Sequence, residues 1–131
     1  MRLSLKAGER IFINGAVIRS ERRVTLELLN DATFLLEAHV MQLEDATSPL
    51  KQLYFIIQSM LITPGTSETT RESVLQMIPD MLSSYPKSEV FVGLEQVRAA
   101  IEENRAYEAL RILRSLFCLE EQVIAEVSKV A

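Results

Sequence analysis

The amino-acid sequence predicts an α+β protein in which a small antiparallel β unit precedes a helical bundle. Between Leu3 and Met41 the apolar side chains recur with a period of two, which places alternate residues on opposite faces of a sheet. After Met41 they recur at spacings of three and four residues, as in an amphipathic helix. We therefore assign residues 1–45 to the β unit, and residues 46–131 to a bundle of four to five helices.

Five short strands are predicted before residue 42, separated by turn signals. The strongest signal is Asn14-Gly15, because both residues tolerate the positive φ of a tight hairpin. In the last strand Phe34, Leu36 and Ala38 are expected to point inward. A sheet this small must pack on another element or on a second copy. The predicted strands, arranged as a meander, span residues 2–6, 10–13, 16–19, 24–28 and 33–40.

The first helix is predicted to begin at Ser48-Pro49, an N-cap residue followed by proline at the first helical position, and to stop at Pro64-Gly65. Its apolar residues, Leu53 and Ile57 among them, leave only a thin polar stripe that includes Gln58, so the helix should be largely buried. A second helix over residues 67–85 contains Pro79, which predicts a kink or a break.

The remaining helices follow from the same kind of signal. Ser88 is expected to cap a third helix, and Asn104-Arg105-Ala106 forms a tight joint to a fourth. At Cys118-Leu119 we expect a bend before a last, more exposed helix.

The composition excludes several classes of protein. The 131 residues are 48% apolar and 24% charged, with four glycines and four prolines, which excludes disordered and low-complexity chains. One cysteine and one histidine cannot form a disulfide framework or a Cys/His zinc cage within one chain. There is no apolar run long enough for a membrane span and no signal peptide. We expect a cytoplasmic protein without metal, cofactor or membrane contact.

Residues that could support catalysis are nearly absent. Adjacent acids occur at Glu44/Asp45, Glu102/Glu103 and Glu120/Glu121. Consecutive helical residues point about 100° apart, so these pairs cannot share one proton, and we interpret them as solvated surface acids. Cys118 lies among apolar neighbours and is predicted to be a buried structural thiol. We expect no enzymatic activity.

Charge is unevenly distributed along the chain. Residues 1–24 carry a net charge of +4, and residues 25–131 carry −8. A basic segment on an acidic body suits an RNA-binding surface, because neutralisation of phosphates drives such binding. The alternative is that these charges only solubilise exposed strand faces. The candidate RNA-binding residues are Arg2, Ser4, Lys6, Arg10, Arg22, Arg23 and His39, with His39 on the outward face of the last strand.

Long stretches of the chain resemble the FlbT family of flagellin post-transcriptional regulators. They are LSLKAGERIFINGAVI (residues 3–18), RVTLELLND (23–31), FLLEAHVM (34–41), PLKQLYF (49–55) and EALRILR (108–114). The resemblance covers nearly the whole chain and is least distinctive over residues 64–92. It implies a non-enzymatic regulator that binds the 5′ untranslated region of flagellin mRNA and promotes its degradation, so that flagellin synthesis is coupled to flagellum assembly. In some members the effect on flagellin is positive.

The N-terminal segment is also similar to the carbon storage regulator (CsrA) fold. The similarity rests on Gly8-Glu9, Ile13, the Asn14-Gly15 turn, and Asn30 before the closing strand. That fold is an intertwined dimer of five-stranded chains in which the first and last strands bind RNA. The resemblance therefore implies RNA contacts from Ser4, Lys6 and Ala7, contacts from Ala38-His39, and a homodimer. His39 stands where that family keeps an arginine.

Two functions remain open from the sequence. In the first, the β unit binds the flagellin mRNA leader directly, which the basic N-terminal segment favours. In the second, the helical body holds flagellin or a flagellin-associated factor and affects translation indirectly. The net acidic body and the large apolar helices favour this second interpretation.

Overall fold

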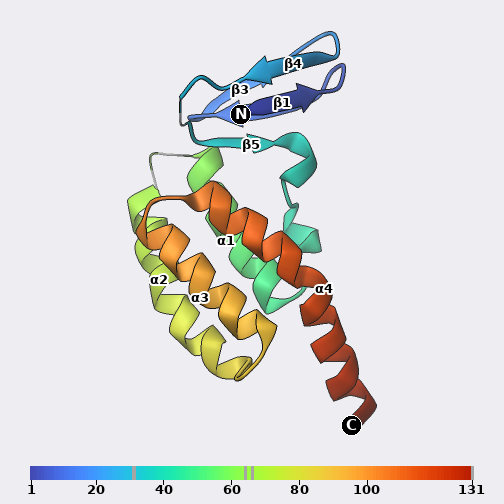
Figure 1. The fold of residues 1–131 in the computed structure, drawn as a ribbon, viewed down its shortest axis with the longest axis vertical. Coiled ribbons are helices and arrows are strands. Elements are labelled where there is room, and N and C mark those ends of the chain that lie inside the picture. Colours follow the sequence, from blue (N-terminus) through green and yellow to red (C-terminus); the bar gives the residue numbers. More distant parts are fainter. Residues whose placement is uncertain (31, 64, 66, 131) are drawn as a thin grey trace.

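A β unit stands on one end of a four-helix bundle in the computed structural model (Figure 1). The structure describes residues 1–30, 32–63, 65 and 67–130, and side chains as far as Gln122. Five strands lie within the first 36 residues and four α-helices follow from Pro49, which confirms the predicted α+β class.

The five strands form two small antiparallel sheets. In one, β1 (Arg2–Leu5) pairs with β4 (Val24–Glu27); in the other, β3 (Ala16–Arg19), β2 (Arg10–Ile13) and β5 (Phe34–Leu36) lie in that order. The predicted meander is therefore wrong, because β4 returns to β1. Asn14 and Gly15 have φ values of 49° and 85° and form the predicted two-residue hairpin turn between β2 and β3.

The fifth strand is shorter than predicted. It ends at Leu36, and Glu37–His39 (η1) form a 3₁₀ turn, followed by a second one at Leu43–Asp45 (η2). Phe34 and Leu36 both contact the smaller core, as expected, whereas Ala38 is exposed and has left the strand, so the expected inward face is wrong at Ala38. Leu35, between them, is buried as well. Since strand side chains alternate in direction, two consecutive buried residues mean that β5 is covered on both faces.

The three-stranded sheet is the middle layer between the helices and the β1–β4 pair. On one face Leu35 and Phe12 pack into the core of the bundle. On the other face a second, smaller core forms from Leu3, Leu5, Ile11 and Phe34. Tyr107, at the start of α4, contacts both cores, and its ring centroid lies 4.4 Å from that of Phe34. The β unit thus packs on the helices of its own chain.

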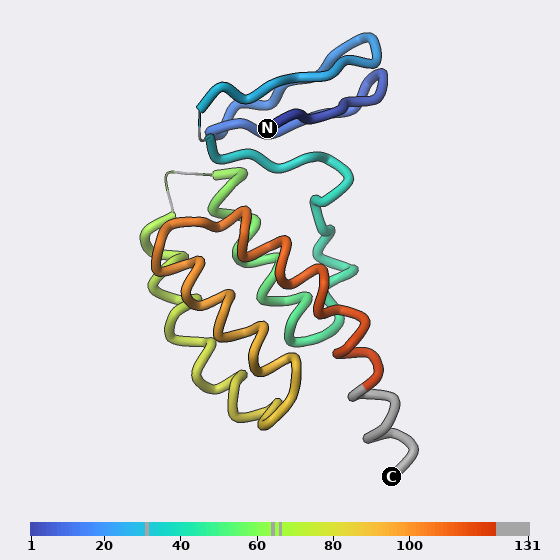
Figure 2. Tube along the Cα trace, viewed as in Figure 1, coloured from blue at the N-terminus to red at the C-terminus, as the bar shows by residue number. Residues whose placement is uncertain are grey.

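The helices are α1 (Pro49–Ile62), α2 (Ser67–Ser84), α3 (Glu89–Glu102) and α4 (Ala106–Val130). They form a ring in which each packs on two neighbours, with α4 beside both α1 and α3 (Figure 2). Ser48 and Ser88 cap α1 and α3 as predicted, their hydroxyls accepting from the N–H groups of Lys51 and Phe91. Pro64, the predicted stop of α1, lies outside the described residues.

Two predicted interruptions are absent from the described helices. α2 continues through Pro79, so the expected break is wrong, and a kink there remains a prediction. Pro79 lies on the exposed side of α2, where water can satisfy the carbonyl that loses its partner. α4 continues through Cys118 and Leu119 without a break, because neither residue interrupts a helix. Cys118 is consequently exposed on α4, so the predicted buried thiol is wrong.

One carboxylate is buried where α1, α4 and the end of α2 meet. Glu120 is 1% exposed and accepts hydrogen bonds from the Ser48 hydroxyl, from the Leu50 N–H at 3.0 Å and from the Tyr85 hydroxyl at 2.9 Å. Burial and the neighbouring carboxylate raise the pKa of Tyr85 to about 12. The prediction of a solvated acid pair is therefore wrong for Glu120, while Glu121 is exposed, 3.7 Å from Lys51.

The buried face of α1 gives a direct test of the core. Leu53 is fully buried, so Leu53→Ala should lower the free energy of unfolding by roughly 2–5 kcal/mol. The variant loses the hydrophobic free energy of the removed carbon atoms, and a cavity remains in the core. Denaturant unfolding measures this change, with Val92→Ala at an exposed position of α3 as the control. A decrease below about 1 kcal/mol for Leu53→Ala would contradict the burial of this face.

Candidate nucleic-acid interface

The outer face of the β1–β4 pair is polar and exposed. Arg2 and Ser4 lie on this face of β1, where Glu27 and Thr25 of β4 stand opposite them in the register. The intervening Leu3 and Leu5 point into the small core. Because Glu27 faces Arg2 across the pair, this surface carries little net charge at that end.

Two loops bring cations together at the other end of the β unit. Leu5 and Val24 are the last pair of the β1–β4 ladder, so Lys6 and Arg23 leave it side by side. The Gly8 N–H donates to the Ser20 carbonyl at 2.8 Å, which joins the loop after β1 to the loop after β3 (Figure 1). We call the exposed side chains of Lys6, Arg19, Arg22 and Arg23 the basic end. In the described part of the chain, none of these four forms an ion pair.

Local hydrogen bonds hold the backbone of both loops. The Ser20 hydroxyl donates to the Arg22 carbonyl at 2.7 Å and accepts from the Arg22 N–H at 3.3 Å. In the other loop the Glu9 N–H donates to the Lys6 carbonyl at 3.0 Å, and Gly8 has a φ of 78°. Long cationic side chains on fixed turns suit contacts to phosphates, which position a nucleic acid without reading its sequence.

Arg10 is engaged within the protein. Its guanidinium lies 3.1 Å from Glu37 Oε1, and its backbone N–H donates to Glu37 Oε2 at 2.8 Å. These interactions, the backbone hydrogen bond foremost, lower the pKa of Glu37, so the carboxylate stays ionised and offsets the charge of Arg10. Arg10 thus ties β2 to η1, and its charge is less available to a phosphate than those of the basic end.

His39 does not lie on an outward strand face, so its predicted position is wrong. It belongs to η1 and is half-buried, and its Nδ1 atom is buried without a hydrogen-bond partner among the described residues. Its carbonyl accepts from the Tyr54 hydroxyl at 2.6 Å, and Arg114 donates to that hydroxyl at 3.1 Å. Burial first, and then the Arg114 charge, lower the pKa of His39, which favours the neutral imidazole at pH 7.

Of the seven predicted residues, the structure gathers Lys6, Arg22 and Arg23 at one end. Arg2 and Ser4 lie on β1, away from this end. Arg10 forms an ion pair with Glu37, and the Nδ1 atom of His39 is buried. Arg19, which is absent from the predicted set, joins the basic end because β3 ends there. Its position next to the polar turn at residues 20–22 is the sequence signal that could have identified it.

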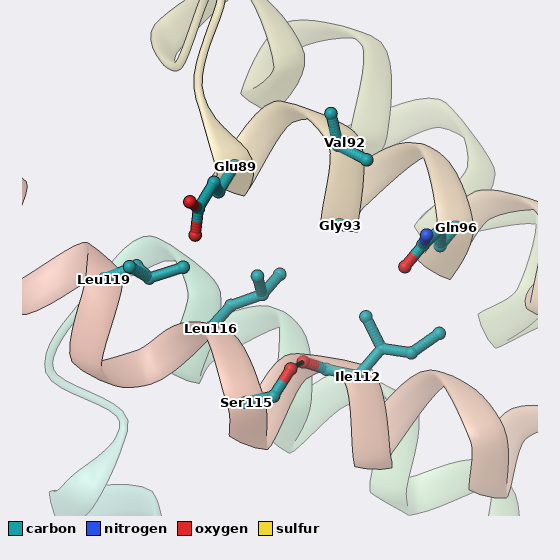
Figure 3. A pocket seen from close by; sticks show the side chains of 8 residues that line it. All are labelled: Glu89, Val92, Gly93, Gln96, Ile112, Ser115, Leu116 and Leu119. Carbon is teal, nitrogen blue, oxygen red and sulfur yellow. Dashed lines mark hydrogen bonds between the residues drawn. The ribbon is translucent and has the colours of Figure 1, made fainter.

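A second exposed surface lies on the bundle. A groove of about 360 Å³ lies between α3 and α4. Figure 3 shows the side chains that line it. The helices approach closely because residue 93 is glycine, where a Cβ atom would lie 2.5 Å from Leu116 Cδ1. Val92 at the rim is 57% exposed. The lining residues are Glu89, Val92, Gly93, Gln96, Ile112, Ser115, Leu116 and Leu119. An apolar groove between helices suits a partner's amphipathic helix.

Membrane spans and metal sites are absent from the described residues. Within them, no helix combines the length and the apolar character that crossing a bilayer requires. The described His, Cys, Asp and Glu side chains likewise form no group of three that could hold a metal ion.

The environment of His39 predicts a dependence of stability on pH. Because its pKa in the folded protein lies below the ordinary 6.5, His39 supports the fold above pH 6.5, and this contribution disappears as the pH falls through the folded-state value. Urea unfolding at pH 7.5 and pH 5.5 should therefore show a smaller decrease in stability for His39→Gln than for the parent chain. Equal decreases would contradict the buried, neutral imidazole.

Comparisons with known proteins give the family. The model of the family described as "Flagellar protein FlbT" matches residues 1–124. A probable flagellum biosynthesis repressor protein FlbT of Brucella anthropi is 48% identical over 130 residues, covering 99% of this chain and 86% of the relative. The protein of the same name from Chelativorans sp. (strain BNC1) is 45% identical over 124 residues, covering 95% of this chain and 86% of the relative. The protein of the same name from Mesorhizobium japonicum is also 45% identical over 124 residues, covering 95% of this chain and 84% of the relative. No solved structure matches this chain. These matches confirm the resemblance to the FlbT family, and the chain belongs to this family of flagellar proteins.

Proposed function

We propose that this chain represses flagellum biosynthesis by binding the 5′ untranslated region of flagellin mRNA and promoting degradation of that message. The repressor role follows the names of its relatives, which are called probable flagellum biosynthesis repressor proteins. The choice of flagellin mRNA follows the resemblance of the sequence to post-transcriptional regulators. The observation that supports RNA as the ligand is the basic end.

The position of the basic end separates it from the acidic part of the molecule. Three of its cations lie on loops of the β unit and Arg19 ends β3, while the helices lie beyond the middle sheet (Figure 1). Residues 25–131 carry a net charge of −8, so an RNA strand is repelled from most of the remaining surface. This arrangement directs a polyanion to the loops formed by residues 6–9 and 19–23.

The proposal predicts a charge-dependent affinity for the leader RNA. The triple variant Lys6→Ala, Arg22→Ala, Arg23→Ala should bind the flagellin leader more weakly in a filter-binding assay. The dependence of log K on log[salt] should also become shallower, by roughly 0.7 for each phosphate that the variant no longer neutralises. The variant should remain folded, because all three side chains are exposed and lie outside the strands.

A matched variant controls for net charge. Arg98→Ala, Arg105→Ala, Arg111→Ala removes the same number of cations from the helical body, where the three arginines pair with Glu95, Glu103 and Glu108. It should bind RNA nearly as the parent does. Equal binding by the parent and the triple variant at the basic end would refute the assignment of this site. In cells, a reporter message carrying the leader should decay faster with the parent chain than with the basic-end variant.

The groove between α3 and α4 favours a second candidate function, in which the helical body holds flagellin or a flagellin-associated factor and acts on translation indirectly. Its apolar floor suits an apolar helix face of such a partner. Gly93→Leu would force Leu116 to move and distort the groove, and the basic end would keep its structure. Under this alternative, Gly93→Leu would abolish regulation, whereas the triple variant at the basic end would leave regulation intact.

A further inference from the structure

We propose that two copies of this chain associate through β3, each pairing its exposed edge with the other in antiparallel fashion. β3 is an outer strand of the three-stranded sheet, and all four of its residues are exposed. Its sequence, Ala-Val-Ile-Arg, contains no proline, and its one charged residue, Arg19, is the last residue of the strand, so that no charge protects the centre of the edge. This edge is therefore open to a further strand.

The side chains of β3 are more exposed than those of the neighbouring strand β2. In the register, Val17 continues the face that Phe12 presents to the bundle, and Ile18 continues the face that Ile11 presents to the small core. Whereas Ile11 is fully buried, Val17 and Ile18 remain 58% and 45% exposed. Apolar side chains on both faces are typical of a strand inside a covered sheet. β3 thus has the composition of an inner strand and the position of an edge.

The hairpin turn determines which backbone groups face outward. In a two-residue hairpin the residues that flank the turn exchange hydrogen bonds, and bonded and non-bonded pairs then alternate. Since Ile13 and Ala16 flank the turn, Ala16 and Ile18 bond to β2. Val17 and Arg19 consequently direct their N–H and C=O groups away from β2, where a strand of a second molecule can pair with them.

The charge pattern favours a second copy in antiparallel orientation. With a two-fold axis at Val17, each Val17 pairs with its equivalent, and each Arg19 lies opposite Gly15 of the second copy. The two basic ends then lie at opposite ends of the joined sheet, whereas a parallel arrangement would place them together. Four residues form a short interface compared with the ~1,600 Å² of a stable complex, so the dimer should be weak and concentration-dependent.

Sedimentation equilibrium of the full chain tests this proposal. The average mass should rise from 14.8 kDa toward twice that value as the protein concentration increases to high micromolar. Val17→Lys places two like charges opposite each other and should raise the dissociation constant about tenfold or more. Val92→Lys makes the same change at an equally exposed valine on α3 and should leave the dimer intact.

A second variant tests the backbone pairing. Val17→Pro removes an N–H that points away from β2, so the hairpin should persist while the dimer dissociates. Amide exchange at Val17 should slow as the parent dimerises, and circular dichroism checks that each variant is folded. The proposal is overturned if the parent stays monomeric at high micromolar concentration, if both Val17 variants dimerise like the parent, or if Val92→Lys is equally disruptive.

Discussion

The bundle depends on one buried carboxylate. Glu120 brings a potential negative charge into the interior, which is costly unless donors satisfy it. Here the Ser48 hydroxyl, the Leu50 N–H and the Tyr85 hydroxyl do so. The first two belong to the start of α1, where unpaired N–H groups and the helix dipole favour an anion. One side chain of α4 thereby holds the start of α1 and the end of α2 together.

The same two helices support the β unit. Gln58 on α1 exchanges two hydrogen bonds with the backbone of Met41, at 2.7 and 2.8 Å, which holds the connection between β unit and bundle. Tyr54 on α1 bonds the His39 carbonyl, and Tyr107 on α4 packs against Phe34. Because these contacts fix the inner side of the β unit, its loops and β3 face solvent. The basic end and the open strand edge are thus placed by the packing of the bundle.

Local signals in the sequence predict most of the elements. Period-two alternation locates the strands, Asn14-Gly15 the hairpin, and Ser48 and Ser88 the helix starts, because these features act within a few residues. Strand order cannot be predicted this way, since the return of β4 to β1 depends on packing over the small core. The predictions of a break at Pro79 and of a separate last helix after Cys118 are wrong: Pro79 lies on the exposed side of a continuous α2, and neither Cys118 nor Leu119 interrupts α4.

Burial of polar residues is the hardest feature to predict. The sequence pattern places Gln58 on a polar stripe and Glu120 in a solvated pair, although Glu120 follows Leu113 and Leu116 on the buried face of α4. That helical spacing is the sequence signal that Glu120 is buried. The donors that satisfy its carboxylate lie 35 or more positions away in the sequence, so no local pattern reveals them. For the candidate site, the basic character of residues 1–24 is visible in the sequence, whereas the internal pairing of Arg10 and the inward position of His39 require the fold.

The unfolding free energy of Glu120→Gln tests the role of this carboxylate most directly. All three partners donate to the carboxylate, whereas a glutamine keeps only one accepting oxygen, so its NH₂ group must either face the Leu50 N–H or turn the Ser48 hydroxyl from donor to acceptor. We expect a decrease of roughly 1–3 kcal/mol, compared with less than about 0.5 kcal/mol for Glu121→Gln on the exposed side of the same helix. A decrease for Glu120→Gln as small as that for Glu121→Gln would contradict the account.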